Sequence, residues 1–133
     1  MTFVVNEQLA ADTAFIADWA LSRVLLMNDK RFAWLILVPR RANIGEIFEL
    51  DEADRQILTS EFCRAGQHLK RLTGCDKINI CAIGNQVSQL HIHVIARKTS
   101  DDVWPSPVWS RGFAVPYEPA EFDAFVQVLV NGL

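Results

Sequence analysis

The sequence predicts an α+β domain, an antiparallel β-sheet of about five strands with two main helices. Short apolar runs separated by polar breaks predict the strands, in residues 13–38 and again in residues 77–97. Apolar residues at spacings of three and four predict the helices, in residues 51–73 and 118–130. With 133 residues and no break in composition, we expect a single domain over residues 1–133.

The first strands form a predicted hairpin. Apolar runs at residues 15–17 and 24–27 are short enough to be strands. A polar break at residues 28–31 then leads into residues 32–38, which are all apolar. Such a run is typical of a central strand covered on both faces. We therefore expect residues 24–27 and 32–38 to pair antiparallel across the break.

Both main helices carry end signals as well as an apolar stripe. Asp51 is the predicted N-cap of the first helix, and Gly74 marks its end. Its predicted buried stripe consists of Leu58, Phe62, Ala65, Leu69 and Leu72. The second helix has Pro119 in its first turn, a position that proline favours. Its predicted buried stripe consists of Phe122, Phe125, Val126, Leu129 and Val130.

The last two predicted strands alternate with a period of two. In residues 77–83, Asn79 and Cys81 share the face opposite Ile78, Ile80 and Ala82. Residues 84–88 form a hairpin-length link into residues 89–97. There, Leu90, Ile92, Val94 and Ala96 face one side, and Gln89, His91 and His93 face the other. If the two strands are neighbours, Asn79 shares the polar face with both histidines.

His91 and His93 are two of only three histidines in the chain, and their spacing brings two imidazoles to one site. Imidazole can act as nucleophile, general acid and proton carrier near neutral pH. A single strand histidine is more often a hydrogen-bonded spacer, but a same-face pair beside a polar neighbour gives the catalytic interpretation comparable weight. A metal site is a weaker alternative, since the pair lacks a third ligand at suitable spacing, and we predict none.

The composition of the chain restricts the classes of partner and the cellular compartment that we expect. A net charge of −3 with scattered Lys and Arg predicts no nucleic-acid polymer as partner. No apolar window approaches the roughly 18 residues of a membrane span, so we expect a cytoplasmic protein with no membrane partner. Cys63, Cys75 and Cys81 lack metal or redox spacing and are expected to be reduced, mostly buried thiols. Burial is expected to raise the pKa of the Cys81 thiol and make it inert.

The motif Gln89-Leu90-His91-Ile92-His93-Val94-Ile95 resembles the signature of the histidine triad (HIT) superfamily, His-φ-His-φ-His-φ-φ with φ apolar. Upstream, Gly84-Asn85-Gln86-Val87 resembles the Gly-Gln-Ser/Thr-Val that precedes the triad, and Leu35-Ile36-Leu37-Val38-Pro39-Arg40 resembles the family's strand ending in Pro and a basic residue. The resemblance covers about residues 20 to 110. With Trp104-Pro105-x-Pro107-Val108-Trp109 added, the pattern is similar to a bacterial branch described as diadenosine tetraphosphate hydrolase-like.

The resemblance implies a HIT-like fold and nucleotidyl transfer to water. His91, at the middle position, would attack the α-phosphate of a dinucleoside polyphosphate or nucleoside phosphate adduct, and water would then release the nucleoside monophosphate. Neutral imidazole is a good nucleophile near pH 7, so the chemistry is reasonable. His93, at the third position, would hold the His91 tautomer or share the phosphate charge. The resemblance requires no cofactor, although Mg²⁺ can arrive with a polyphosphate.

Three further positions resemble the family's substrate-binding residues. Gln86 stands where the family has a Ser or Thr contacting the phosphate or leaving group. Asn79 resembles the phosphate-contacting amide on the preceding strand. Asn28 resembles the ribose-binding Asn or Asp after the first sheet strand, with Asp29 as an adjacent candidate.

Gln89 departs from the signature, which has its first His there. An amide can donate to a phosphate oxygen but cannot carry a proton or positive charge. If this position only positions the phosphate, the loss is modest; if it supplies transition-state charge, the rate falls on the order of 10² to 10³. The sequence therefore leaves two functions open. One is a catalytically competent hydrolase, and the other is a nucleotide-binding or sensing module with weak or lost catalysis.

Family members are commonly homodimers, so the resemblance also implies a homodimer. The apolar strands and residues 104–109 are the candidate interface. Trp104 and Trp109 lie in a segment predicted to be irregular, because two prolines impose extended backbone there. Both tryptophans either cover the sheet or form an apolar wall for a flat ligand or a partner chain.

Overall fold

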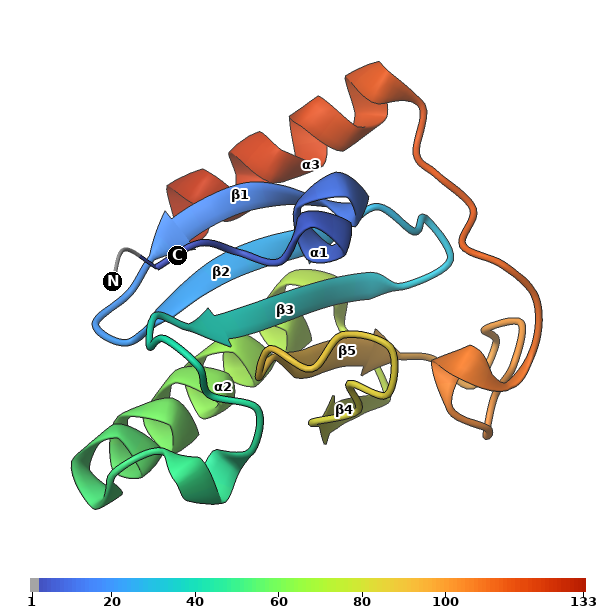
Figure 1. Cartoon of the computed structure of the whole chain (residues 1–133). Coiled ribbons are helices and arrows are strands. Elements are labelled where there is room, and N and C mark those ends of the chain that lie inside the picture. The colour runs from blue at the N-terminus through green and yellow to red at the C-terminus, as the bar shows by residue number, and fades with distance from the viewer. Residues whose placement is uncertain (1–2) are drawn as a thin grey trace.

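The computed structural model describes residues 3–133, which fold around a five-stranded sheet (Figure 1). In chain order the helices and strands are α1 (Glu7–Asp12), β1 (Thr13–Asp18), β2 (Ser22–Met27), β3 (Ala33–Pro39), α2 (Glu52–Thr73), β4 (Lys77–Cys81), β5 (Ile92–Arg97) and α3 (Pro119–Gly132). Short 3₁₀ turns lie at Ile47–Glu49 and Val108–Ser110. The strand order is β1-β2-β3-β5-β4, and every neighbouring pair is antiparallel. The predicted α+β fold is confirmed.

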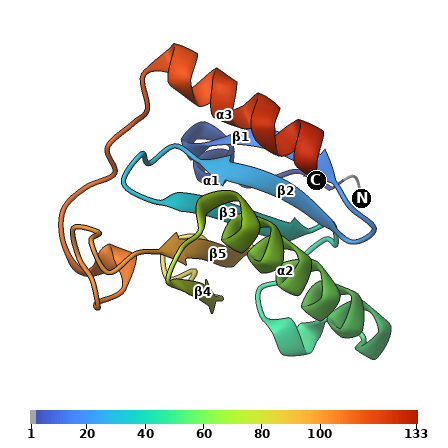
Figure 2. The ribbon, with the colours of Figure 1, turned by 180° about the vertical axis from the view of Figure 1, so that it is seen from behind.

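Helices α2 and α3 cover one face of the sheet (Figure 2). Their buried side chains, which include Leu58, Leu69 and Leu129, pack against alternate residues of β2, β3 and β5. On β5 these alternate residues are Ile92, Val94 and Ala96, as the period-two pattern predicts. The larger hydrophobic core therefore lies between the sheet and these two helices.

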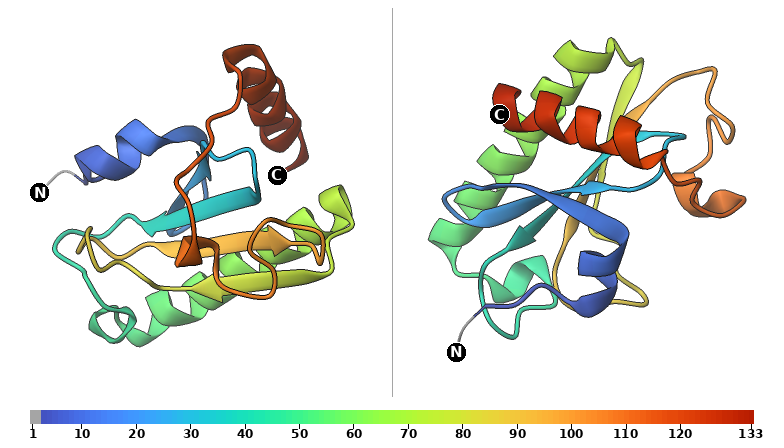
Figure 3. Two further views of the ribbon diagram at one scale, coloured as in Figure 1. Left: turned by 90° about the vertical axis from the view of Figure 1, so that its right-hand side faces the viewer. Right: turned by 90° about the horizontal axis from the view of Figure 1, so that it is seen from above.

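The opposite face of the sheet carries a second, smaller core. Trp34 and Ile36 of β3 and Ile95 of β5 form its floor. Leu9 of α1, together with Val103 and Val108 from the irregular segment after β5, covers that floor. In the left view of Figure 3 the sheet separates α1 from α3. The central strand is thus buried on both faces, and mostly short or irregular segments cover the second face.

The predicted helix ends agree with the structure. The Asp51 side chain accepts a hydrogen bond from the Asp54 main-chain N–H, which caps α2. Gly74 ends the helix with φ of 64°, a left-handed conformation that glycine adopts without strain. Helix α3 begins at Pro119. No helix within residues 3–133 has the length and apolar character to cross a bilayer.

Two strand boundaries and one cysteine differ from expectation. The histidine strand begins at Ile92 and not at residue 89, because the Leu90 N–H donates to the Ile44 carbonyl in a loop outside the sheet. Strand β4 ends at Cys81. Cys63 is exposed on α2, whereas Cys75 is buried and Cys81 is half-buried. Burial raises the pKa of the Cys81 thiol, as predicted.

The α2 stripe gives a direct test of the core. Leu69 is fully buried, so Leu69→Ala should lower the free energy of unfolding by roughly 2 to 5 kcal/mol through lost burial and a residual cavity. Leu72, on the same helix, is 40% exposed, and Leu72→Ala should cost clearly less. Urea denaturation followed by circular dichroism measures both. Equal losses in the two variants would mean that α2 does not pack as described.

Candidate active site

A cavity of about 390 Å³ opens on the second face of the sheet, beside the histidines. Its lining comes from α1, from β2 and β3, from the loop between β4 and β5, and from the 3₁₀ turn after β5. The lining residues are Gln8, Leu9, Asp12, Met27, Trp34, Ile36, Ile83, Gly84, Asn85, Gln86, Val87, His91, His93 and Trp109. Of the residues that the sequence predicts for the site, His91, His93 and Gln86 therefore meet at one cavity.

His91 lies just before β5 and is held by a single hydrogen bond within the described residues. Its Nδ1 lies 2.7 Å from the main-chain carbonyl oxygen of Gln89. A carbonyl can only accept, so Nδ1 carries a proton, and in the neutral tautomer with this bond Nε2 has the lone pair. No hydrogen bond among residues 3–133 uses that Nε2. The His91 residue is buried overall and belongs to the lining of the cavity.

Gly84 allows the His91 ring to lie against the chain. A β-carbon at position 84 would stand 2.7 Å from the Val87 carbonyl oxygen and 3.0 Å from Cε1 of His91. The first distance is too short for any side chain, so glycine is required for this close approach. The absence of a side chain at position 84 thus allows the loop between β4 and β5 to pack against the His91 imidazole.

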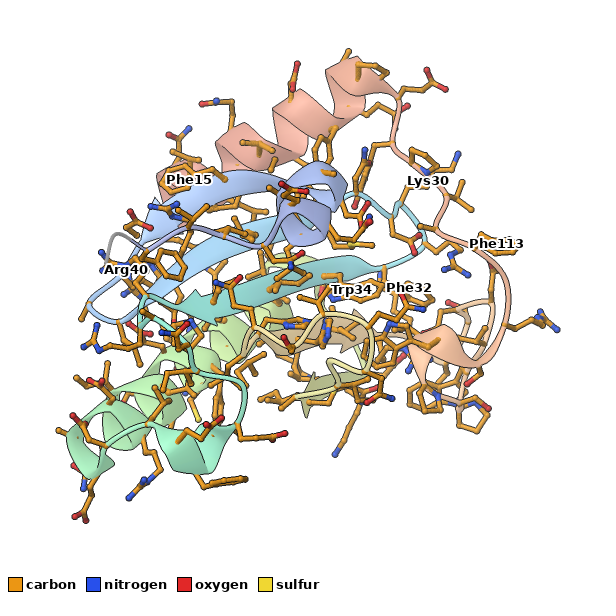
Figure 4. The ribbon with its side chains drawn as sticks, viewed as in Figure 1. Phe15, Lys30, Phe32, Trp34, Arg40 and Phe113 are labelled. Carbon is orange, nitrogen blue, oxygen red and sulfur yellow. The ribbon has the colours of Figure 1, made fainter. Side chains whose placement is uncertain are left out.

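His93 is fully hydrogen-bonded and electrically neutral. The Trp34 Nε1–H donates to its Nδ1 at 3.1 Å, and its own Nε2–H donates to the Ile83 carbonyl at 2.9 Å. Figure 4 shows Trp34 projecting from β3 on the side of β5. Burial, chiefly, lowers the pKa of His93 to about 4, and nearby His91 adds to the effect. His93 therefore supports the loop at Ile83 as a neutral ring, and neither of its nitrogens is free for a metal or a phosphate.

Three aromatic rings surround His93. The His91 and His93 centroids lie 4.9 Å apart with the rings nearly perpendicular. Trp109 meets His93 edge-on at 4.8 Å and meets Trp34 at 5.6 Å. Trp109 is 42% exposed and lines the cavity, so it forms an apolar wall there. Its neighbour Val108 packs into the second core and covers the sheet.

The polar groups of the cavity are mainly amides. Asn85, Gln86 and Val87 line it, and no hydrogen bond within residues 3–133 uses their main-chain N–H groups. No Lys or Arg lines the cavity, and Asp12 is the charged side chain in its lining. An anion at His91 would therefore be met by amide donors instead of cationic side chains.

The Gln89 side chain does not line this cavity. Its amide bonds to the main chain of Val4 and Asn6 and lines a separate surface hollow. Because β5 starts only at Ile92, the period-two alternation does not extend back to residue 89. Position 89 contacts His91 through its main-chain carbonyl and not through its side-chain amide.

Asn79 lies on the histidine face but away from His91. It pairs with Ile95, while Cys81 is the residue opposite His93. The Asn79 side-chain oxygen accepts from the buried Arg97 guanidinium at 2.9 Å. Asn79 lines an apolar groove along β4 that reaches Trp109, not the histidine cavity.

Asn28 and Asp29 also lie outside the lining of the cavity. The Asn28 side-chain oxygen accepts from the Tyr117 N–H at 2.9 Å. Asp29 is buried and pairs with Arg31 at 2.8 Å. Both side chains hold neighbouring chain segments in place.

Sequence reasoning missed Trp34 and the contribution of α1. A signal for Trp34 exists: in the β3–β5 register it lies opposite Ile95, and Ile36 lies opposite His93, so the indole shares the histidine face. A signal for α1 is absent, because residues about 80 positions apart meet there only through the tertiary fold.

The comparison with family models matches the HIT domain over residues 8–100. The chain belongs to the histidine triad (HIT) family. Three solved histidine triad proteins are similar over nearly their whole length. The protein from Sinorhizobium meliloti 1021 has 46% identity and a TM-score of 0.94, covering 99% of this chain and 98% of that one. A comparison with curated proteins gives no match.

The other two HIT proteins are from Bradyrhizobium japonicum and Marinobacter aquaeolei VT8. The first has 41% identity and a TM-score of 0.94, covering 99% of this chain and 98% of that one. The second has 42% identity and a TM-score of 0.92, covering 98% of this chain and 94% of that one. These full-length HIT neighbours match the architecture described above.

The buried, neutral His93 predicts a specific pH dependence of stability. Its pKa is about 4 in the folded protein and about 6.5 when unfolded, so between these values only the unfolded chain binds the proton. Stability should therefore rise with pH across this window, by at most about 1.4 kcal/mol per pH unit from this group. A ¹⁵N-edited NMR titration of the imidazoles should show His93 protonating near pH 4. A midpoint above pH 6 would contradict the described desolvation.

Proposed function

We propose that this HIT protein is a nucleotide hydrolase that works through a nucleotidyl-histidine intermediate on His91. The bond it cleaves would be a phosphate anhydride or phosphoramidate bond. The observation that carries the proposal is the Nδ1–H donation from His91 to the Gln89 carbonyl, which leaves the Nε2 lone pair of the neutral ring without a partner in residues 3–133, on a residue that lines a cavity. Membership of the HIT family supports nucleotide chemistry at this site.

In the first half-reaction, His91 Nε2 would attack the α-phosphorus. The N–P bond forms while the bond from phosphorus to the leaving group breaks, and the leaving group departs with the electron pair. The imidazole becomes cationic, and its Nδ1–H interacts more strongly with the Gln89 carbonyl as that charge develops. The phosphoryl oxygens would meet the Gln86 side chain and the N–H groups of Asn85 to Val87.

In the second half-reaction, water would attack phosphorus and break the N–P bond. The electron pair returns to Nε2, the water proton passes to solvent, and the nucleoside monophosphate leaves. His93 would stay neutral throughout, because its two nitrogens keep their partners Trp34 and Ile83. His93 would thus position the loop, which is neither of the two roles expected from the sequence: the Gln89 carbonyl, not His93, bonds His91 Nδ1, and a neutral His93 adds no charge.

The narrower substrate proposal is a dinucleoside polyphosphate such as diadenosine tetraphosphate. The support is the Gln-φ-His-φ-His motif followed by Trp104 to Trp109, with Trp109 as a flat apolar surface in the cavity. The lining offers no cationic side chain to such a polyanion. We therefore propose that Mg²⁺ enters with the polyphosphate and compensates its charge.

A second candidate is a nucleotide-binding or sensing module with weak catalysis. The observation that favours it is the Gln89 side chain, which neither faces the cavity nor supplies charge there. Such a module would bind the nucleotide and retain it uncleaved. The two candidates differ in whether a bond breaks at phosphorus.

Removing the His91 nucleophile separates the two candidates. With diadenosine tetraphosphate and Mg²⁺, or with a chromogenic adenosine phosphoramidate, His91→Ala should reduce AMP release by at least about 10³-fold. Intact mass after an acid-free quench should show an adenylyl adduct in the wild type and none in the variant. His68→Ala is the matched control, because His68 lies on α2 and does not line the cavity. Nucleotide binding without release, unchanged in His91→Ala, would contradict the hydrolase.

We also propose that the protein is a cytoplasmic homodimer. Within residues 3–133, β4 is an edge strand paired only with β5, and Ile80 and Ile83 beside it are more than 40% exposed. Light scattering should give twice the chain mass, and Ile80→Glu should shift it toward the monomer. A monomeric wild type would contradict this proposal without affecting the His91 chemistry.

A further inference from the structure

The Gln89 side chain is bound to the N-terminal segment by two hydrogen bonds. Its Oε1 accepts from the Asn6 main-chain N–H at 2.8 Å, and its Nε2–H donates to the Val4 carbonyl at 2.9 Å. The orientation of the amide is fixed by chemistry, because the N–H can only donate and the carbonyl can only accept. Gln89 thus pairs with the segment as a strand neighbour would.

This segment leads directly into α1, which supplies one wall of the cavity. The α1 wall consists of Gln8, Leu9 and Asp12. Its far end is fixed to the sheet, since the Asn28 N–H donates to the Asp12 carbonyl and the Thr13 hydroxyl donates to the Leu9 carbonyl. Its near end is fixed by Gln89 through residues 4 and 6. The packing of Leu9 into the second core lies between the two ends.

The same residue also holds the nucleophile. The Gln89 carbonyl accepts from His91 Nδ1 at 2.7 Å, while its side chain holds the segment that begins α1. The imidazole and the α1 wall are therefore both placed relative to residue 89. If the α1 wall moves away from His91, the two hydrogen bonds of the Gln89 side-chain amide must break first.

We infer that Gln89 is a positioning residue that sets the fit of the nucleotide by holding the α1 wall against the loop that carries His91. This inference rests on the proposed function for its kinetic consequence. The wall contacts the bound nucleotide but not the bond being broken, so it contributes to ground-state and transition-state binding equally. Loss of the Gln89 amide should raise KM about tenfold and change kcat by less than about twofold.

The rival role for Gln89 is donation from its amide to a phosphate oxygen. That role requires both bonds to the N-terminal segment to break, and it predicts the opposite kinetic result. A donor that acts on transition-state charge would lower kcat by about 10²-fold with little change in KM. The ratio of the two kinetic constants therefore distinguishes the roles.

The N-terminal partner can be tested separately from Gln89. Asn6 has φ of −49°, which a proline can adopt. Asn6→Pro therefore fits the backbone and removes the N–H that donates to Gln89 Oε1. It also removes the side-chain cap on the Gln8 N–H. Asn6→Ala removes the cap alone and is the matched control. The assay uses diadenosine tetraphosphate and Mg²⁺ with the three single variants Gln89→Ala, Asn6→Pro and Asn6→Ala. It also includes the two double variants that combine Gln89→Ala with Asn6→Pro or with Asn6→Ala.

Coupling between the variants identifies the contact. Gln89→Ala, which breaks both hydrogen bonds, should raise KM about tenfold, and Asn6→Pro, which breaks one of them, should raise it less. The double variant should match Gln89→Ala, because the bond that Asn6→Pro removes is already lost there. Asn6→Ala alone should leave KM close to the wild-type value. Asn6→Ala combined with Gln89→Ala should have a KM close to that of Gln89→Ala alone. A KM unchanged in Gln89→Ala, or a fall in kcat instead, would overturn the inference.

Hydrogen exchange of the α1 amides tests the inference without any turnover. The Ala10 N–H, which bonds to the Asn6 carbonyl, should exchange about tenfold faster in Gln89→Ala than in the wild type. Unchanged exchange overturns the inference whatever the enzymatic activity. Faster exchange in a protein that releases no AMP supports the positioning role and contradicts the proposed hydrolase instead.

Discussion

The hydrogen bond from His91 Nδ1 to the Gln89 carbonyl is the contact on which the site depends. At 2.7 Å it fixes which ring nitrogen carries the proton and leaves the other with its lone pair. Because a main-chain oxygen accepts this hydrogen bond, the side chain at position 89 is free to make other contacts. In this HIT protein it contacts the N-terminal segment. The hydrogen bond to His91 therefore does not depend on which side chain stands at position 89.

His93 and Trp34 explain how a polar loop is held over an apolar sheet. A buried imidazole without partners would be costly, but here the indole N–H satisfies one nitrogen and the Ile83 carbonyl accepts from the other. Through these two hydrogen bonds the His93 ring fixes Ile83, at the start of the loop, relative to the sheet. Gly84 then lets that loop approach His91 closely. Sheet, loop and nucleophile form one chain of contacts.

The sequence predicted the architecture well, because periodicity and end signals are local. The strands, Asp51, Gly74 and most of the stripes of α2 and α3 follow from spacing alone, but Leu72 and Val130, which were predicted to be buried, are 40% and 41% exposed. The motif also placed His91, His93 and Gln86 at one cavity. Gln89, Asn79 and Asn28 do not line that cavity, because their side chains bond to the N-terminal segment, to Arg97 of the neighbouring strand and to Tyr117. Each amide is satisfied by a main-chain or guanidinium group nearby in space, which spacing does not reveal.

The lining of the cavity also bears on how a ligand arrives. Long-range attraction requires charge of one sign around an opening, and among the described residues the lining offers amides, aromatic rings and the carboxylate of Asp12. An anion would approach His91 without attraction from cationic side chains in the lining. Selection would then operate after contact, through shape and hydrogen-bond geometry.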